Sequence, residues 1–292
     1  NAPGYDQEVG DRAYLAPTGA LSLNWNAIGL YLRPGTSPGS AATADVEPPS
    51  EYFTVESKLL TGSATQRRFN VTLEPDKDKV RQKLVVTGFV PTDKGAWSVW
   101  KKVDQPALYF GWTLKSLLLQ RGFKFKGKIR VEKTPGSARM LTVAQSDTLD
   151  IILKKLNKNS QNFIAEQLIK TLGAEAPGGQ PGSTARGIEV VEDFLEKEVG
   201  LRRGAYVMKN GSGLNDTNRF SAAQITRLLE AMWQKFPTAP EYLSSLGIAG
   251  KDGTLKFRFD GTDATGRLRA KTGTLENVSA LAGYLQAMSG ER

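Results

Sequence analysis

The hydrophobic pattern of this chain changes from strand-like to helix-like near its middle, and that change limits the folds available to it. Before the change, short apolar runs and alternating stretches lie between turn residues, as in a β-rich domain. The stretch 134–137, Thr-Pro-Gly-Ser, breaks the pattern, and helical spacing follows as far as residue 235. We therefore expect a boundary near 135–145, with a β-rich domain over 1–140 and a second domain over 141–292.

Within the β-rich part, the sequence predicts a hairpin, a long loop, a helix and several strands. Alternation on both sides of Asn24-Trp25-Asn26 predicts a hairpin over 20–32, and the Pro, Gly, Ser and Ala content of 34–50 predicts a surface loop. A helix is expected over 106–120 because its leucines have helical spacing, with Gly122 as the C-terminal cap. Further strands are expected over 51–60, 67–73, 83–90 and 128–132.

The helices predicted for the second part have recognisable end signals. Ser146 is a candidate N-cap of the first helix, Gly173 and Gly200 are expected to end the second and third, and Ser221 with Gln224 forms a capping box before the fourth. A strand pair over 267–287, whose second strand is an apolar run suited to burial, would complete an α/β layer. The four helices are expected over 147–158, 161–172, 184–199 and 222–235.

The chain has 292 residues and contains neither Cys nor His, which excludes whole classes of site. There can be no disulfide, no thiolate nucleophile, no imidazole base and no Cys/His zinc centre, so a Ser-His-Asp triad is impossible. A hydroxyl nucleophile would need lysine or a carboxylate as its base, and lysine acts as a base only where its pKa is lowered. We expect no cofactor and no metal.

A net charge of +9 favours anionic surfaces, whether cell-wall polymers, membranes or nucleic acid. Because the basic residues look dispersed and no nucleic-acid-binding motif is recognisable, nucleic acid is not an expected partner. No apolar stretch of 18 residues predicts a transmembrane helix, and the lack of cysteine is compatible with the cytoplasm and with an oxidising envelope alike. A start at Asn1, without Met or a signal peptide, indicates a mature or cut product.

The motif Lys271-Thr272-Gly273-Thr274 places a cation, two hydroxyls and a glycine, which has no side chain, on one predicted strand. A substrate that ends in a carboxylate needs a cation and hydroxyl donors, and an extended peptide can lie along such an edge only where no side chain blocks it. Lys-Thr-Gly is one of three sequence elements shared by penicillin-binding proteins and β-lactamases. A turn that leaves a strand is the alternative interpretation of the same residues.

Ser160 and Asn162 form a Ser-x-Asn element at a predicted helix junction. The pair offers a hydroxyl that can relay a proton and an amide that can hold a peptide carbonyl. A helix N-cap at Ser160 would explain the element equally well, and Ser22 with Asn24 is a second instance of the same spacing.

Two glycines surround Ser212 in the stretch 210–214, Asn-Gly-Ser-Gly-Leu. This composition predicts a tight turn, while backbone amides that line a cleft remain the alternative. No Walker lysine follows, so phosphate binding is not expected.

The joint order of these elements resembles the class C low-molecular-mass penicillin-binding proteins, which are D-alanyl-D-alanine carboxypeptidases/endopeptidases of the bacterial cell wall. The resemblance covers nearly the whole chain and implies a transpeptidase-like α/β fold with a β-rich accessory domain inserted after the first catalytic motif. Residues 1–140 would be the accessory part, and 141–292 the second half of the transpeptidase-like domain. The matching strings are 14–24, 158–166, 181–187, 211–221, 250–258, 270–275 and 281–284.

The resemblance implies a serine-type reaction through an acyl-enzyme and gives roles to residues of this chain. Ser160 would relay a proton, Asn162 would hold the substrate carbonyl, and Lys271 would give electrostatic support. Thr272 and Thr274 would bind the terminal carboxylate, and the Thr274 amide would be an oxyanion donor. We therefore expect Ser160, Asn162 and Lys271 to border one cleft, with Lys271 in hydrogen-bonding distance of Ser160.

The expected substrate-binding set also includes Gly273, Ser212 and Tyr14, the last from the accessory-domain string. Asp216 and Glu276 occupy places where, in the family as the resemblance implies it, some members have a basic and a neutral polar residue. If both face the cleft, they should favour a substrate side chain with a free amine. Two solvated surface carboxylates are the alternative.

One departure from the family is large. Its nucleophile is the serine of a Ser-x-x-Lys motif that precedes the accessory domain, whereas this chain begins inside that domain. The single Ser-x-x-Lys spacing here is Ser98 to Lys101, where the family has no nucleophile. We therefore expect the nucleophile to be absent from this chain, the chain to be part of a longer parent, and the chain alone to be inactive.

The resemblance implies peptidoglycan peptides and β-lactams as partners, a missing segment of the same polypeptide as a further one, and the periplasm or cell envelope of a bacterium as the location. Two other classes remain open. A non-catalytic peptidoglycan-binding relative would keep the cleft without a nucleophile, and a basic nucleic-acid-binding module would need clustered Lys, Arg and aromatic residues.

Overall fold

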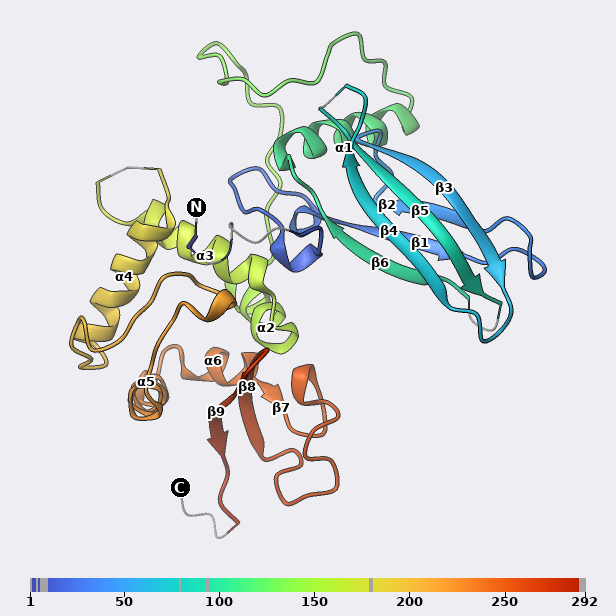
Figure 1. The fold of residues 1–292 in the computed structure, drawn as a ribbon. Coiled ribbons are helices and arrows are strands. Elements are labelled where there is room, and N and C mark those ends of the chain that lie inside the picture. Colours follow the sequence, from blue (N-terminus) through green and yellow to red (C-terminus); the bar gives the residue numbers. More distant parts are fainter. Residues whose placement is uncertain are drawn as a thin grey trace. The chain divides into compact units, whose positions relative to one another are not determined.

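The computed structural model of the chain describes residues 2–3, 5, 10–78, 80–92, 95–178 and 181–288 (Figure 1). The chain divides into two compact units. The β unit comprises Val9–Arg139, and the α/β unit comprises Met140–Arg292 together with Asn1–Glu8. Since the first residues belong to the second unit, this division differs from a boundary drawn only near residue 140. Each unit is described by itself.

The described residues of the β unit form two three-stranded sheets and one long helix. In one sheet, β1 lies between β2 and β6 and is antiparallel to both. In the other, β5 lies between β3, which is parallel to it, and β4, which is antiparallel. The elements are β1 (Ala27–Arg33), β2 (Thr43–Glu47), β3 (Phe53–Gly62), β4 (Arg68–Pro75), β5 (Gln82–Pro91), β6 (Trp97–Lys102) and α1 (Pro106–Gln120).

The two sheets and α1 share one hydrophobic core. Alternate residues of a strand point to the same face, so β1 buries Ile28, Leu30 and Leu32 completely. Tyr109 of α1 is fully buried against them, and its ring meets that of Tyr52 edge to face at 5.9 Å. Full burial of one such apolar side chain stabilises a fold by about 1.5–3 kcal/mol, so this core holds the β unit together.

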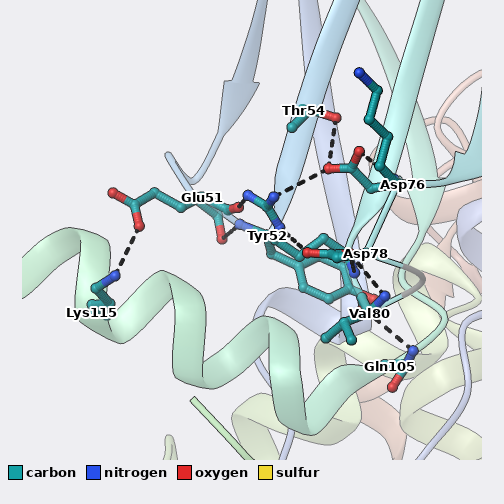
Figure 2. A network of polar contacts seen from close by, with 11 residues as sticks. Glu51, Tyr52, Thr54, Asp76, Asp78, Val80, Gln105 and Lys115 are labelled. Atoms are coloured by element: carbon teal, nitrogen blue, oxygen red, sulfur yellow. Dashed lines mark hydrogen bonds and ion pairs between the residues drawn. The ribbon is translucent and has the colours of Figure 1, made fainter. Parts of the chain in front are cut away.

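A polar network around Arg81 fixes the turn before β5 to the helix (Figure 2). The Arg81 guanidinium donates to Asp78 at 2.7 Å and to the Glu51 carbonyl at 3.3 Å, and it lies 5.5 Å from the ring centre of Trp112 on α1. Hydrogen bonds from the Arg81 backbone and side chain lower the pKa of Asp78 to about 2. Lys115 of α1 binds the Glu51 carboxylate at 3.3 Å and closes the network.

The predicted hairpin over 20–32 is wrong. Asn24, Trp25 and Asn26 all have positive φ, and the buried Asn26 side chain accepts from the Leu23 amide and donates to the Pro17 carbonyl at 2.7 Å. These bonds fold the preceding segment into a loop, because side chains rather than a partner strand satisfy its backbone. The partners of β1 are instead β2, inside the predicted 34–50 loop, and β6, which the sequence pattern did not show.

The other predicted strands of the β unit are confirmed, apart from 128–132, which forms no strand. There Ile129 packs against α1, since a Cβ at Gly111 would lie 2.8 Å from it. The stretch 121–133 carries six of the basic residues, alternating with the exposed Phe123 and Phe125. Basic charge is therefore concentrated here, contrary to the expectation that it is dispersed. Gly122, with φ +84°, ends α1 as predicted.

In the α/β unit, the four predicted helices are confirmed, and the described residues add a short helix, a short strand and two 3-10 helices, Leu214–Asp216 and Gly253–Leu255. The strands form one antiparallel sheet in the order β7, β8, β9 (Figure 1). None of the described helices is long and apolar enough to cross a membrane. The elements are α2 (Leu149–Asn159), α3 (Asn162–Glu175), α4 (Thr184–Lys197), α5 (Ala222–Gln234), α6 (Ala239–Ser245), β7 (Gly247–Ile248), β8 (Leu268–Leu275) and β9 (Val278–Leu285).

The capping box before α5 is confirmed. Ser221 Oγ accepts from the Gln224 amide at 3.3 Å, and Gln224 Oε1 accepts from the Ser221 amide at 2.8 Å. Ser146 does not cap α2, because Thr148 occupies the N-cap position and the Ser146 hydroxyl bonds to the carbonyl of Asp147.

The strand β9 is not buried as expected. Val278, Leu281 and Leu285 are 46%, 42% and 60% exposed, and among the described residues β9 pairs only with β8. An apolar run is therefore not sufficient for burial, which also requires a layer to cover it.

Gly173 does not end its helix, because α3 continues to Glu175. Its role is close packing against α4: a Cβ at Gly173 would lie 2.9 Å from the Gly187 amide nitrogen, and a Cβ at Gly187 would lie 1.8 Å from the Ile169 carbonyl oxygen. The two helix backbones touch at this point, which only glycine allows.

We expect Gly187→Ala to destabilise the α/β unit by about 2–3 kcal/mol, because the new methyl group overlaps a backbone oxygen. Inside a helix, the same exchange normally stabilises by about 1 kcal/mol. Urea unfolding measures the change, with Gly200→Ala as control. Gly200 has φ +71°, but a Cβ there would meet no atom within 4 Å, so Gly200→Ala should lower the free energy of unfolding by about 1 kcal/mol. A gain in stability for Gly187→Ala would contradict the packing argument.

Candidate active site

The turn between α2 and α3 presents Ser160. This residue follows the last residue of α2 with a left-handed backbone (φ 54°, ψ 52°), and its amide donates to the Leu156 carbonyl. A left-handed conformation costs a non-glycine residue about 1–2 kcal/mol, so surrounding contacts must hold it. Ser160 does not cap α3, since Gln161 occupies that position and makes no side-chain cap. The N-cap interpretation is therefore wrong, and Asn162 is the first residue of α3.

The structure brings Lys271 of β8 to Ser160. The Lys271 ammonium donates to Ser160 Oγ at 2.7 Å and to the Thr272 carbonyl at 2.6 Å. Burial lowers the pKa of Lys271 below the ordinary lysine value. A serine hydroxyl has two acceptor lone pairs and one proton to donate. One lone pair of Ser160 Oγ accepts the bond from Lys271, so the second lone pair and the hydroxyl hydrogen can bond to another partner.

The edge of β8 beyond this lysine is open. Among the described residues, β7 pairs only with Arg269 and Ala270 of β8. Gly273 and Thr274 are exposed, and a Cβ at Gly273 would meet only Ala280, at 3.5 Å. Such an edge can accept an extended peptide as an additional strand.

A hydroxyl pair continues the site on the other side of Lys271. The Thr272 hydroxyl donates to Thr254 Oγ1 at 2.8 Å. Thr254 lies in a short 3-10 helix, Gly253–Leu255, and is a residue that sequence reasoning did not single out. The only signal for it was the 250–258 string of the family resemblance.

The loop that carries Thr254 packs onto the end of α2. Asp252 accepts from the Ile248 amide at 2.9 Å and forms an ion pair with Lys158 at 2.5 Å. Gly253 has φ +59°, and a Cβ there would lie 2.9 Å from the Lys158 carbonyl oxygen. Sequence reasoning gave no role to Lys158 or Asp252, which lie 94 residues apart.

The loop around Ser212 is a tight turn, and its amides are used internally. The Ser212 amide donates to the fully buried Glu166 carboxylate at 2.8 Å, and the Gly213 amide donates to Asn210 at 2.8 Å. Asn210 is also fully buried and donates to the Pro3 carbonyl at 2.9 Å. These contacts favour the turn interpretation over a cleft lined by free amides.

Among the described residues of the α/β unit, no hydrogen bond or ion pair joins Asp216, Glu276 or Asn162 to the Lys271–Ser160 pair. Asp216 forms an exposed ion pair with Arg219 at 2.9 Å. Glu276 is exposed in the turn after β8, and Tyr14 belongs to the β unit, where Arg12 lies 5.9 Å from its ring centre. Asn162 is half buried beside Ser160.

Ser98 and Lys101 lie on a strand, and this placement separates them. Side chains three residues apart on a strand point to opposite faces. Ser98 is exposed, whereas Lys101 lies on the face of Val99 and binds the Asp11 carboxylate. Lys101 cannot take a proton from Ser98, so this spacing is no catalytic motif.

A cavity of about 890 Å³ in the α/β unit lies between α5 and the hairpin of β8 and β9. Trp233, Arg269 and Tyr284 line it, and none of the candidate residues does. In the described part of the chain, no three carboxylates come together as metal ligands.

The lowered pKa of Lys271 gives a direct prediction. Burial disfavours the charged ammonium, so its titration midpoint should lie below the value of about 10.4 that a free lysine shows. An NMR titration of the lysine side chains measures this midpoint, with Lys271→Arg to assign the signal. A midpoint at or above the free value would mean that the ammonium is not desolvated.

The amino-acid sequence and the fold place the chain among known proteins. It is 32% identical to the D-alanyl-D-alanine carboxypeptidase of Actinomadura sp. (strain R39), over 87% of this chain and 47% of that protein. It is 30% identical to D-alanyl-D-alanine carboxypeptidase DacB of Haemophilus influenzae, over 65% and 40%. Penicillin-binding protein 4 from the same organism has a similar fold, with a TM-score of 0.76, 21% identity and coverage of 99% and 63%.

The chain spans about half the length of the curated relatives that it matches. The match to one family extends over residues 1–292. The chain therefore belongs to the D-Ala-D-Ala carboxypeptidase 3 (S13) family.

Proposed function

We propose that this chain supplies one side of the active site of a serine-type D-Ala-D-Ala carboxypeptidase that cleaves peptidoglycan stem peptides through an acyl-enzyme. The observation that carries the proposal is the 2.7 Å hydrogen bond between Lys271 and Ser160, which joins the Lys-Thr-Gly strand to the Ser-x-Asn junction. Membership of the S13 family supports it. A penicillin-binding protein 4 of similar fold is known in complex with a β-lactam, which supports β-lactams as ligands.

In this proposal, Ser160 relays the proton that the nucleophile loses. Lys271 holds one lone pair of the Ser160 hydroxyl, so the other can accept that proton while the hydroxyl hydrogen passes to the leaving amine. The lysine charge also stabilises the negative charge that develops during attack. A buried cation does this better than an exposed one, because less water screens it.

The substrate would lie along the open edge of β8. Its terminal carboxylate would bind Thr272 and Thr274, Asn162 would hold its carbonyl, and the Thr274 amide would donate to the oxyanion. In the structure the Thr272 hydroxyl donates to Thr254, so it must turn away from Thr254 to reach a carboxylate. Gly273 lets the peptide approach the backbone.

The nucleophile would come from a Ser-x-x-Lys segment outside these 292 residues, because Lys101 faces away from Ser98, and Ser160 with its partner Lys271 has the role of the proton relay. The activity belongs in the periplasm or cell envelope of a bacterium, where peptidoglycan lies. A non-catalytic peptidoglycan-binding protein is the second candidate, and acylation separates the two.

In the full-length gene product, we expect a fluorescent penicillin to form a stoichiometric adduct, and Lys271→Ala to slow its formation about 100-fold or more. Ser160→Ala should slow acylation by a similar factor through the lost relay. Denaturing mass spectrometry follows the adduct. Lys155→Ala is the control, since Lys155 lies on α2 and, among the described residues, pairs with Asp147 rather than with any residue of the site.

Three results would count against this assignment. A full-length protein that binds penicillin without a covalent adduct would favour the non-catalytic candidate. An adduct located on Ser98 or Ser160 would show that the nucleophile lies in this chain. Equal rates for Lys271→Ala and Lys155→Ala would remove Lys271 from the site.

Discrimination between substrate side chains should depend on Glu276 more than on Asp216. The Asp216 carboxylate is paired with Arg219, so it attracts a substrate amine less than the exposed Glu276 does. In the full-length gene product, Glu276→Gln should reduce the preference for an amine-bearing peptide over its acylated analogue, and Asp216→Asn should reduce it less. The opposite order of losses, measured by binding competition, would rule out this assignment.

A further inference from the structure

The Lys271–Ser160 hydrogen bond forms only if two elements that are far apart in the sequence are held together. Ser160 ends α2 with an exposed side chain, whereas Lys271 lies in the sheet, 111 residues later in the chain. Among the described residues, the backbone amides of Ser160 and its successor bond only to the Leu156 carbonyl at the helix end, and these bonds do not tie Ser160 to the sheet. Some other contact has to hold the end of α2 against the sheet.

Asp252 provides one such contact, beside the hydrogen bond that Asn157 of α2 donates to Ser245 Oγ at 2.8 Å. One carboxylate oxygen, Oδ1, accepts from the Ile248 amide at 2.9 Å, and Ile248 of β7 pairs with Arg269 of β8. The other, Oδ2, binds the Lys158 ammonium at 2.5 Å, two residues before Ser160. A continuous path of bonds therefore runs from the sheet through Asp252 to the last turn of α2.

Backbone packing reinforces the same path. The virtual Cβ of Gly253 lies 2.9 Å from the Lys158 carbonyl oxygen and 3.1 Å from its Cα, so the loop and the helix end are in direct contact. Thr254, the next residue, accepts a hydrogen bond from the Thr272 hydroxyl, and this bond connects the loop to β8 beside Lys271.

The Lys158–Asp252 pair differs from the other ion pairs of α2. Lys154 binds Asp150 and Lys155 binds Asp147, so both of these pairs join residues close in the sequence and span no gap between elements. The Lys158–Asp252 pair spans 94 residues, and its lysine is only 22% exposed. A cation in the last turn of a helix also interacts favourably with the free carbonyls there.

We infer that Lys158 and Asp252 are positioning residues, whose ion pair keeps the Ser160 hydroxyl within hydrogen-bonding reach of Lys271. The inference rests on the proposed function, because it gives the pair a role in acylation. It predicts that loss of the pair slows the covalent step without weakening the initial binding of the β-lactam, since neither residue lies on the open edge of β8.

The test compares Asp252→Asn and Lys158→Met with Asp147→Asn in the full-length gene product. Asp147→Asn removes a charge from an exposed ion pair that joins Lys155 of the same helix to a residue just before it, and is the matched control. In the first two variants, we expect the amides of 160–161, both bonded to Leu156, to exchange with deuterium about 10-fold faster. The penicillin acylation rate should fall about 10-fold, with less than a twofold change in the dissociation constant of the non-covalent complex.

Lys158→Arg keeps the positive charge, so it should retain at least half of the acylation rate that Lys158→Met loses. Wild-type exchange and wild-type acylation in Asp252→Asn would overturn the inference. Faster exchange with unchanged acylation would also overturn it, because the ion pair would then be merely structural. If the wild-type protein forms no adduct, the proposed function fails, and exchange at 160–161 alone decides whether the pair holds Ser160.

Discussion

The α/β unit depends on close contact between backbones at a few glycines. At Gly187 the helices α3 and α4 touch, and at Gly253 a loop touches the end of α2. Side chains of ordinary size would separate these elements by several ångströms. Because α3 begins two residues after Ser160, its packing on α4 determines where the Ser-x-Asn junction lies, and Gly253 determines how near the sheet approaches it. Site geometry here is a consequence of backbone packing.

The charge of Lys271 is the main electrostatic feature of the candidate site. The chain has no histidine, so Lys271 is the group whose surroundings most favour proton exchange among the candidate residues. Its burial, its short bond to Ser160 and the open edge of β8 are separate properties, and each is common alone. Their coincidence on one strand is the basis on which we propose an acyl-transfer site here rather than an ordinary buried lysine.

Local signals predicted much of this fold, and long-range contacts explain most of what they missed. Caps such as Ser221 with Gln224 depend on neighbouring residues alone, so the helices were predicted correctly. The hairpin at 20–32 was wrong because alternation does not reveal the left-handed run at Asn24–Asn26. The order of motifs predicted the meeting of Ser160 and Lys271. The 250–258 string included Asp252 and Thr254 but gave them no role, because nothing local marks a contact across the chain.

The pairing of β1 with β6 has a consequence for folding. Ala27 lies opposite Lys102, so the first strand of the β unit must wait for the last before its sheet is complete. Such non-local pairing slows folding, because a long loop must close before the contact stabilises anything. During synthesis, β1 would leave the ribosome well before its partner and present an unpaired edge in the meantime. Cells that make this protein therefore need to keep that edge from pairing with other chains until residue 102 has emerged.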